Sequence, residues 1–145
     1  MIEYQKILDK NMLNVFKDVL TNIKNNGLTS NNHLYITFLS NHSKVIIPTW
    51  LKKKYPEEMT IIIQYEYYDI EINKNYFSIT LSFDDIKTNL QIEYDSIISF
   101  ADPSANFGLI LKKRKIKKKF NKDKDTDVKN KETDNVINFE NYKKN

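Results

Sequence analysis

The stretch that decides the fold runs from Met59 to Leu111 and begins with MTIIIQYEYYDIEINKNYFSITLSFDD, residues 59–85. It begins with a β-branched run at residues 59–65 and continues with alternating apolar and polar residues at 67–72, 76–83 and 90–94. Asp84 and Asp85 mark a turn. A period of two indicates strands with one buried and one solvated face. Several short strands with no long helix between them predict an antiparallel meander that curls into a small barrel or a closed sheet.

A helix is expected before this stretch. Apolar residues recur at steps of three and four from Tyr4 to Ile23, which is typical of a helix with one apolar stripe, and Gly27 suits a left-handed cap at its end. The stripe either packs only on the sheet or also meets a twin helix in a homodimer. In the second case Tyr4 and Met12 would form the dimer interface.

The remaining elements of the fold are short. Residues 33–39 alternate strictly and predict the first strand, and Pro48 predicts a helix at residues 49–54 with Trp50 and Leu51 facing inward. Two more strands are expected at residues 97–100 and 107–111. The expected fold class is therefore mainly β (α+β), with an N-terminal helix packed on a bent antiparallel sheet.

The distribution of charge divides the chain. The net charge is +4, but 13 of the 23 Lys/Arg and 6 of the 19 Asp/Glu lie from Lys112 onward. Residues 112–145 therefore carry +7 and residues 1–111 carry −3. We expect a folded domain at residues 1–111, a disordered basic linker at 112–135 and a separate segment at 136–145, because the linker has almost nothing apolar to bury.

The basic run and the end of the chain each leave two interpretations open. Residues 112–119 are either the start of a solvated linker or a contact for nucleic acid or an acidic partner. Apolar residues return at the end of the chain, and they form either a short docking peptide or a stray end that folds back. They are Val136, Ile137, Phe139 and Tyr142, followed by Lys143.

The residues needed for several kinds of chemistry are missing. The chain has no cysteine, and its two glycines, Gly27 and Gly108, cannot build a phosphate-binding loop or a nucleophile elbow. His33 and His42 lack the spacing of a metal pair. We therefore expect no catalytic residues, no metal and no cofactor. No stretch reaches the roughly 20 apolar residues of a membrane span, and we expect a cytoplasmic protein without a signal peptide.

Five segments together resemble one known family. They are IPTWL (47–51), YPEEMTI (55–61), YYDI (67–70), FSITLSF (77–83) and FADPSANFGL (100–109). With this spacing the chain resembles the α-proteobacterial branch of the stringent starvation protein B (SspB) family, the adaptors of the ClpXP protease. Tyr67 and Tyr68 stand where a Phe-Trp pair is expected, and the tail is unusually rich in lysine.

The resemblance implies a helix on a strongly bent Sm-like or SH3-like barrel, usually in a homodimer, with a groove that binds ssrA-tagged proteins. It also implies a tail whose last residues dock on the N-terminal zinc-binding domain of the ClpX unfoldase. The implied groove residues are Ile63, Gln64, Tyr65, Ser78 and Thr80, with His33, Tyr35 and Phe100 as further candidates. The implied docking residues are Val136, Ile137, Phe139, Tyr142 and Lys143. Ile63 and Phe100 are equally compatible with plain core positions.

Two other classes of function stay open from the sequence. One is an Sm-like RNA-binding protein with a basic tail, although nucleic acid is not the expected partner because the folded part is acidic. The other is a structural or assembly subunit with no affinity for an ssrA peptide.

Overall fold

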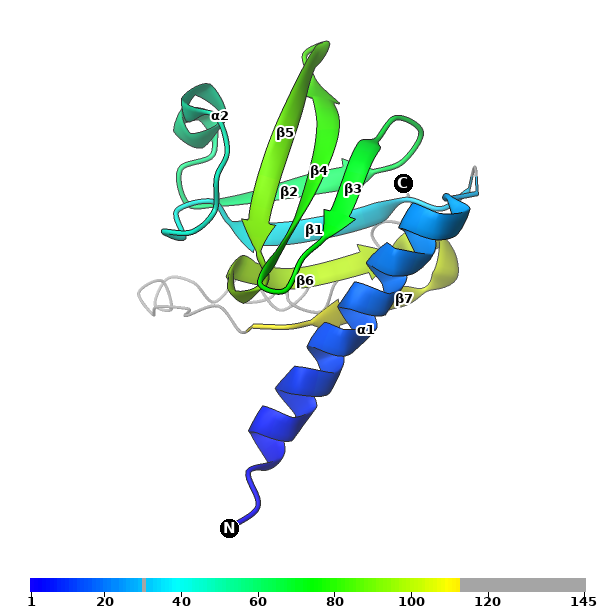
Figure 1. Ribbon diagram of the computed structural model, residues 1–145, viewed down its shortest axis with the longest axis vertical. Coiled ribbons are helices and arrows are strands. Elements are labelled where there is room, and N and C mark those ends of the chain that lie inside the picture. The colour runs from blue at the N-terminus through cyan, green and yellow to red at the C-terminus, as the bar shows by residue number, and fades with distance from the viewer. Residues whose placement is uncertain (30, 113–145) are drawn as a thin grey trace, which may run out of the picture.

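The computed structural model describes residues 1–29 and 31–112. In these residues two α-helices, seven strands and two short 3-10 helices follow one another (Figure 1). In chain order they are α1 (Tyr4–Asn26), β1 (Leu34–Leu39), α2 (Thr49–Lys54), β2 (Glu58–Ile63), β3 (Tyr68–Ile72), β4 (Tyr76–Phe83), β5 (Ile86–Glu93), η1 (Tyr94–Ser96), β6 (Ile97–Asp102), η2 (Pro103–Ala105) and β7 (Phe107–Ile110). None of the described helices is long and apolar enough to cross a membrane.

The strands form two antiparallel sheets. One sheet has the order β2-β1-β6-β7 and the other has the order β3-β4-β5. Their strands run in very different directions in Figure 1, as in sheets that pack orthogonally. Burial alternates along β1, β2 and β4, so each sheet turns one face toward a shared core.

The expected single meander from residue 59 to Leu111 is only partly present. The strands β3, β4 and β5 form a meander, but β2 and β6 both pair with β1, which becomes a central strand. Outside the named strands of the described residues, Ile46 of the segment between β1 and α2 makes one antiparallel bridge, to Gln91 of β5. The two sheets are not closed into a continuous barrel, because β2 pairs with β1 and not with β3, the next strand in the chain.

The C-terminal half of α1 completes the core. Phe16 and Leu20 are fully buried and Ile23 is nearly so. The ring of Phe16 lies 5.6 Å from that of Phe77 on β4 and 4.9 Å from that of Phe100 on β6. One helical side chain thus contacts both sheets.

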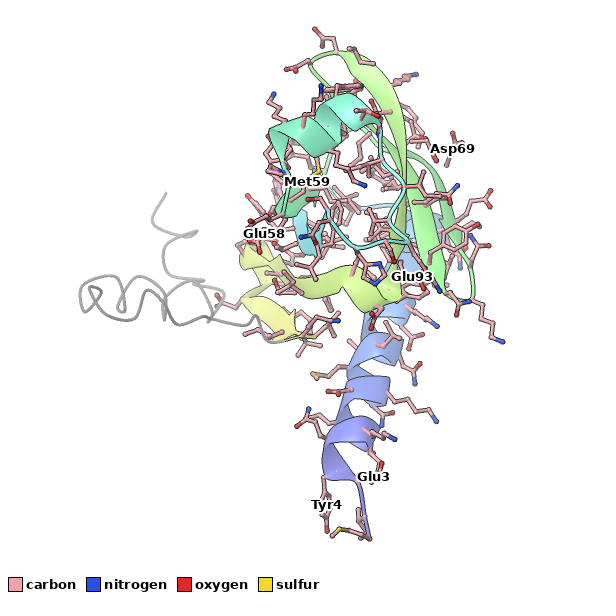
Figure 2. All side chains as sticks on the ribbon, turned by 90° about the vertical axis from the view of Figure 1, so that its left-hand side faces the viewer. Glu3, Tyr4, Glu58, Met59, Asp69 and Glu93 are labelled. Carbon is pink, nitrogen blue, oxygen red and sulfur yellow. The ribbon has the colours of Figure 1, made fainter. Side chains whose placement is uncertain are left out.

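The N-terminal half of α1 extends away from the sheets, and Figure 2 shows Glu3 and Tyr4 at its far end. Tyr4, Ile7 and Leu8 are each more than half exposed. The apolar stripe therefore packs on the core only from about Leu13 onward. In the described part of the chain, the first turns of the stripe are exposed and lie outside the core.

The predicted turns and the short helix are present, although some of their details differ from the prediction. Asp84 and Asp85 have φ of 54° and 67°, the left-handed pair required by a two-residue hairpin turn. Gly27 ends α1 with a φ of 80°, which favours glycine, but its ψ of 174° lies outside the left-handed helical region that was expected for the cap; its N–H donates to the carbonyl of Ile23 at 2.8 Å. Leu51 is buried as expected, but Trp50 is 39% exposed, so its predicted inward orientation was wrong. The neighbouring position on a single helical turn points about 100° away from Leu51.

Candidate functional site

A groove of about 530 Å³ lies between β2, the segment that follows it, and the end of β4. Its lining residues are Thr60, Ile61, Ile62, Gln64, Tyr65, Glu66, Leu81, Ser82 and Phe83. Ile61 and Leu81 are buried and form an apolar floor, whereas Tyr65 is 73% exposed. The groove therefore combines an apolar base with polar and aromatic side chains at its rim.

Both walls of the groove are strand edges that have no partner strand in the part of the chain that the structure describes. In its sheet β2 is an edge strand, paired only with β1. The pairing of β3 with β4 begins at Tyr68 opposite Thr80, so residues 81–83 of β4 pair only with β5. Within the described residues, both walls thus offer backbone N–H and C=O groups to an additional strand.

Two of the predicted groove residues, Gln64 and Tyr65, line this groove. Ser78 and Thr80 lie further back on β4, on its outer face, opposite Glu71 and Tyr68 of β3. The hydroxyl of Thr80 accepts a hydrogen bond from the Asn89 amide at 3.0 Å. The structure thus brings Gln64 and Tyr65 together at the groove and places Ser78 and Thr80 next to it.

The other predicted groove residues lie in three different places. Ile63 and Phe100 are buried in the core beneath the sheets. The ring of His33 meets that of Tyr65 edge-on at 5.6 Å, so His33 stands at the rim of the groove. Tyr35 lies on β1 opposite Ile62 of β2. Their part in binding stays a prediction.

Sequence reasoning did not select the rest of the lining. Thr60, Ile62 and Glu66 come from β2 and the following segment, and residues 81–83 come from the end of β4. The only available signal for Glu66 was the change from a β-branched run to polar residues after Ile63. No signal for residues 81–83 exists, because their role depends on where β3 stops pairing.

The described residues contain no cluster of three or more His, Cys, Asp or Glu side chains that could hold a metal ion. Burial raises the pKa of Tyr94 to about 12. Burial acts to raise the pKa of Asp95, but hydrogen bonds and charge from His42 and Lys112 outweigh it and hold that pKa below its ordinary value. Neither Tyr94 nor Asp95 lines the groove.

A second hollow, of about 970 Å³, follows the exposed part of α1. Leu8, Met12 and Leu13 of α1 form one side, and Ile110 and Leu111 near the end of the described chain lie on the other. It is continuous with the exposed apolar stripe of α1.

The predicted linker at residues 112–135 lies beyond the described residues except for Lys112. The predicted docking segment, which includes Val136, Ile137, Phe139, Tyr142 and Lys143, lies wholly outside them. Both therefore stay predictions.

The chain matches a known protein family. A search of curated proteins found no match. A family sequence model described as stringent starvation protein B matches residues 6–144, which is nearly the whole chain. The chain therefore belongs to the SspB (stringent starvation protein B) family, and this membership suggests an adaptor role in degradation by ClpXP.

Proposed function

We propose that this protein is a non-catalytic adaptor that holds ssrA-tagged polypeptides in the groove and tethers them to the ClpX unfoldase through its C-terminal segment. The observation that carries the proposal is the pair of partnerless strand edges, at β2 and at residues 81–83 of β4, on either side of one groove. Such edges favour an extended peptide that binds as an added strand.

A peptide that binds as an added strand gains its affinity from backbone groups of the groove and its specificity from side chains. Backbone hydrogen bonds to the strand edges contribute roughly 0.5–1.5 kcal/mol each and read no sequence. Alternate side chains of the peptide would meet the apolar floor at Ile61 and Leu81, while the others face the rim at Gln64, Tyr65 and Ser82. The groove would thus accept an extended tag with alternating apolar and polar positions.

The remaining predicted residues extend this site. Ser78, Thr80, His33 and Tyr35 would contact the parts of a longer peptide that lie beyond the groove. Ile63 and Phe100, which are buried, would support the walls from beneath.

The tether is proposed from the sequence beyond Lys112. Residues 136–145 would bind the N-terminal zinc-binding domain of ClpX through Val136, Ile137, Phe139, Tyr142 and Lys143. A flexible chain with the length of residues 112–135 has an end-to-end distance of roughly 25–30 Å, which gives an effective concentration on the order of millimolar. Weak individual contacts would then suffice, in the cytoplasm where ClpXP works.

A homodimer is part of the proposal. The exposed apolar side chains Tyr4, Ile7 and Leu8, together with the hollow beside α1, support a second copy of this helix as the partner. Two copies would carry two grooves and two tails, and the paired tails would raise the avidity for ClpX.

RNA binding is not favoured by the groove. Among the described residues its lining contains Glu66 and no Lys, Arg or His, whereas an RNA phosphate backbone requires cationic contacts.

The test is fluorescence anisotropy with a labelled ssrA peptide and the full chain. We expect saturable binding that Tyr65→Ala weakens several-fold, because Tyr65 lines the groove and its exposure leaves the fold unaffected. The matched control is Tyr55→Ala, since Tyr55 is also an exposed tyrosine and lies outside the groove. Absence of ssrA binding, or equal losses in both variants, would contradict the proposal.

A further inference from the structure

The groove has a single formal charge among its lining side chains. Glu66 is the only acidic residue there, and no Lys, Arg or His is among the described residues that line the groove. Glu66 is exposed and takes part in no salt bridge within residues 1–29 and 31–112. Its carboxylate is therefore available to a bound ligand.

Two further carboxylates lie at one end of the groove. Asp84 and Asp85 follow Phe83 directly at the end of one wall, and of these two carboxylates Asp84 alone forms a salt bridge within the described residues, with Lys54 at 3.7 Å. Lys87, which pairs with Ser82, has its ammonium group 4.3 Å from the centre of the Tyr68 ring. Lys87 is thus held over an aromatic face outside the groove and forms no salt bridge with Glu66 within the described residues.

We infer that the groove selects extended peptides that place a lysine or arginine side chain opposite Glu66, and that it discriminates against an acidic side chain at that position. This inference rests on the proposed peptide-binding function of the groove. A basic side chain gains an ion pair with a carboxylate that has no other partner in the described part of the chain, whereas an acidic side chain meets a like charge. Because Glu66 is solvated, the preference is modest, about two- to tenfold between Lys and Glu, and decreases with added salt.

The experiment uses anisotropy with the full chain and a set of labelled ssrA-derived peptides. In each peptide one position in turn carries Lys, Gln or Glu, so the position that faces Glu66 is found without assuming the direction of the bound peptide. Binding is measured for the unchanged protein, for Glu66→Gln and for Glu66→Lys. The matched control is Glu71→Gln, which removes one exposed carboxylate from β3 outside the groove and changes the net charge equally.

One peptide position is expected to favour Lys over Glu in the unchanged protein and in Glu71→Gln. At that position the preference is lost in Glu66→Gln and reversed in Glu66→Lys. If peptides bind but no position shows a preference that depends on Glu66, the inference is overturned while the proposed function stands. If no ssrA-derived peptide binds at all, the proposed function fails, and the inference fails with it.

Discussion

Replacing Phe16 with alanine tests whether α1 is an integral part of the fold that positions the groove. The side chain is fully buried and meets aromatic rings from both sheets, Phe77 at 5.6 Å and Phe100 at 4.9 Å. It also lies 6.4 Å from the ring of Tyr94. Phe16→Ala would therefore leave a cavity between two sheets and a helix.

The expected loss follows from that cavity. Truncation of a buried phenylalanine to alanine costs about 3–5 kcal/mol in the free energy of unfolding. The value here is expected in the upper half of that range, because sheet strands on both sides cannot easily collapse into the space. Domains of this size have an unfolding free energy of only about 5–15 kcal/mol, so the variant would lose a large share of its stability.

Urea unfolding followed by circular dichroism measures this loss. With a denaturant slope of about 2 kcal/mol per molar, a 4 kcal/mol loss lowers the midpoint by about 2 M. Phe107→Ala is the matched control, because Phe107 is 39% exposed although its ring lies 5.9 Å from Phe100. Equal losses for the two variants, or a loss below about 2 kcal/mol for Phe16→Ala, would refute the view that α1 closes the core between the sheets.

Four other perturbations test separate parts of the molecule. Leu8→Asp places a charge in the hollow beside α1, and we expect light scattering to show a monomer in place of the proposed dimer. A dimer that persists in this variant would show that the dimer interface lies elsewhere. Deletion of residues 136–145 is expected to leave ssrA-peptide affinity unchanged and to abolish accelerated degradation by ClpXP, and acceleration that survives would reject the tether. Asp69 has a φ of 51°, so Asp69→Val is expected to cost about 1–2 kcal/mol in thermal unfolding, with Asp69→Gly as the tolerated control; equal melting of both would show that the conformation carries no strain. The lowered pKa of Asp95 means that its charge stabilises the fold above the unfolded-state pKa of about 4, and that this contribution is lost as the pH falls through the lower folded-state pKa. Asp95→Asn should therefore reduce the dependence of unfolding free energy on pH below about 4 in urea titrations, and an unchanged profile would contradict the assignment.

The features that the sequence predicted well are those set by local chemistry. Pro48 precedes α2, the alternation at residues 76–83 matches β4, and Asp84 and Asp85 form the hairpin turn. Each depends on backbone preferences within a few residues, so no knowledge of distant partners was needed. The segment of α1 from Phe16 to Ile23 was likewise visible as an apolar stripe.

The pairing of distant strands could not be predicted in the same way. An alternating segment reports which face is buried but not which strand lies beside it, so the partners β1 and β2, separated by α2, were missed. The stripe on α1 also does not reveal how far the sheets extend along the helix. Tyr4 and Phe16 have similar apolar patterns around them, yet one is 73% exposed and the other is fully buried.

In the candidate site, too, the residues that could not be predicted are those that depend on strand pairing. Gln64 and Tyr65 were found from the resemblance to the SspB family, whereas the wall at residues 81–83 was not. That wall becomes a binding edge only because the pairing of β3 starts at Tyr68, opposite Thr80.

The β3–β4 pairing does not extend beyond Tyr68 and Thr80, and this has a local cause. The limited pairing explains why an extended peptide is the proposed ligand. The register of β3 against β4 shifts between Tyr68 and Glu71, and Asp69 within this bulge has a positive φ. Figure 2 places Asp69 on the outer side of the sheet. A bulge bends its strand and increases the local twist, so the chain before Tyr68 leaves the edge of β4 instead of following it. A straight β3 would continue beside residues 81–83 and occupy the groove with its own backbone. The groove is therefore bordered by backbone groups that a further strand could pair with, and for this reason an extended peptide, and not a helix or a compact ligand, is the proposed ligand.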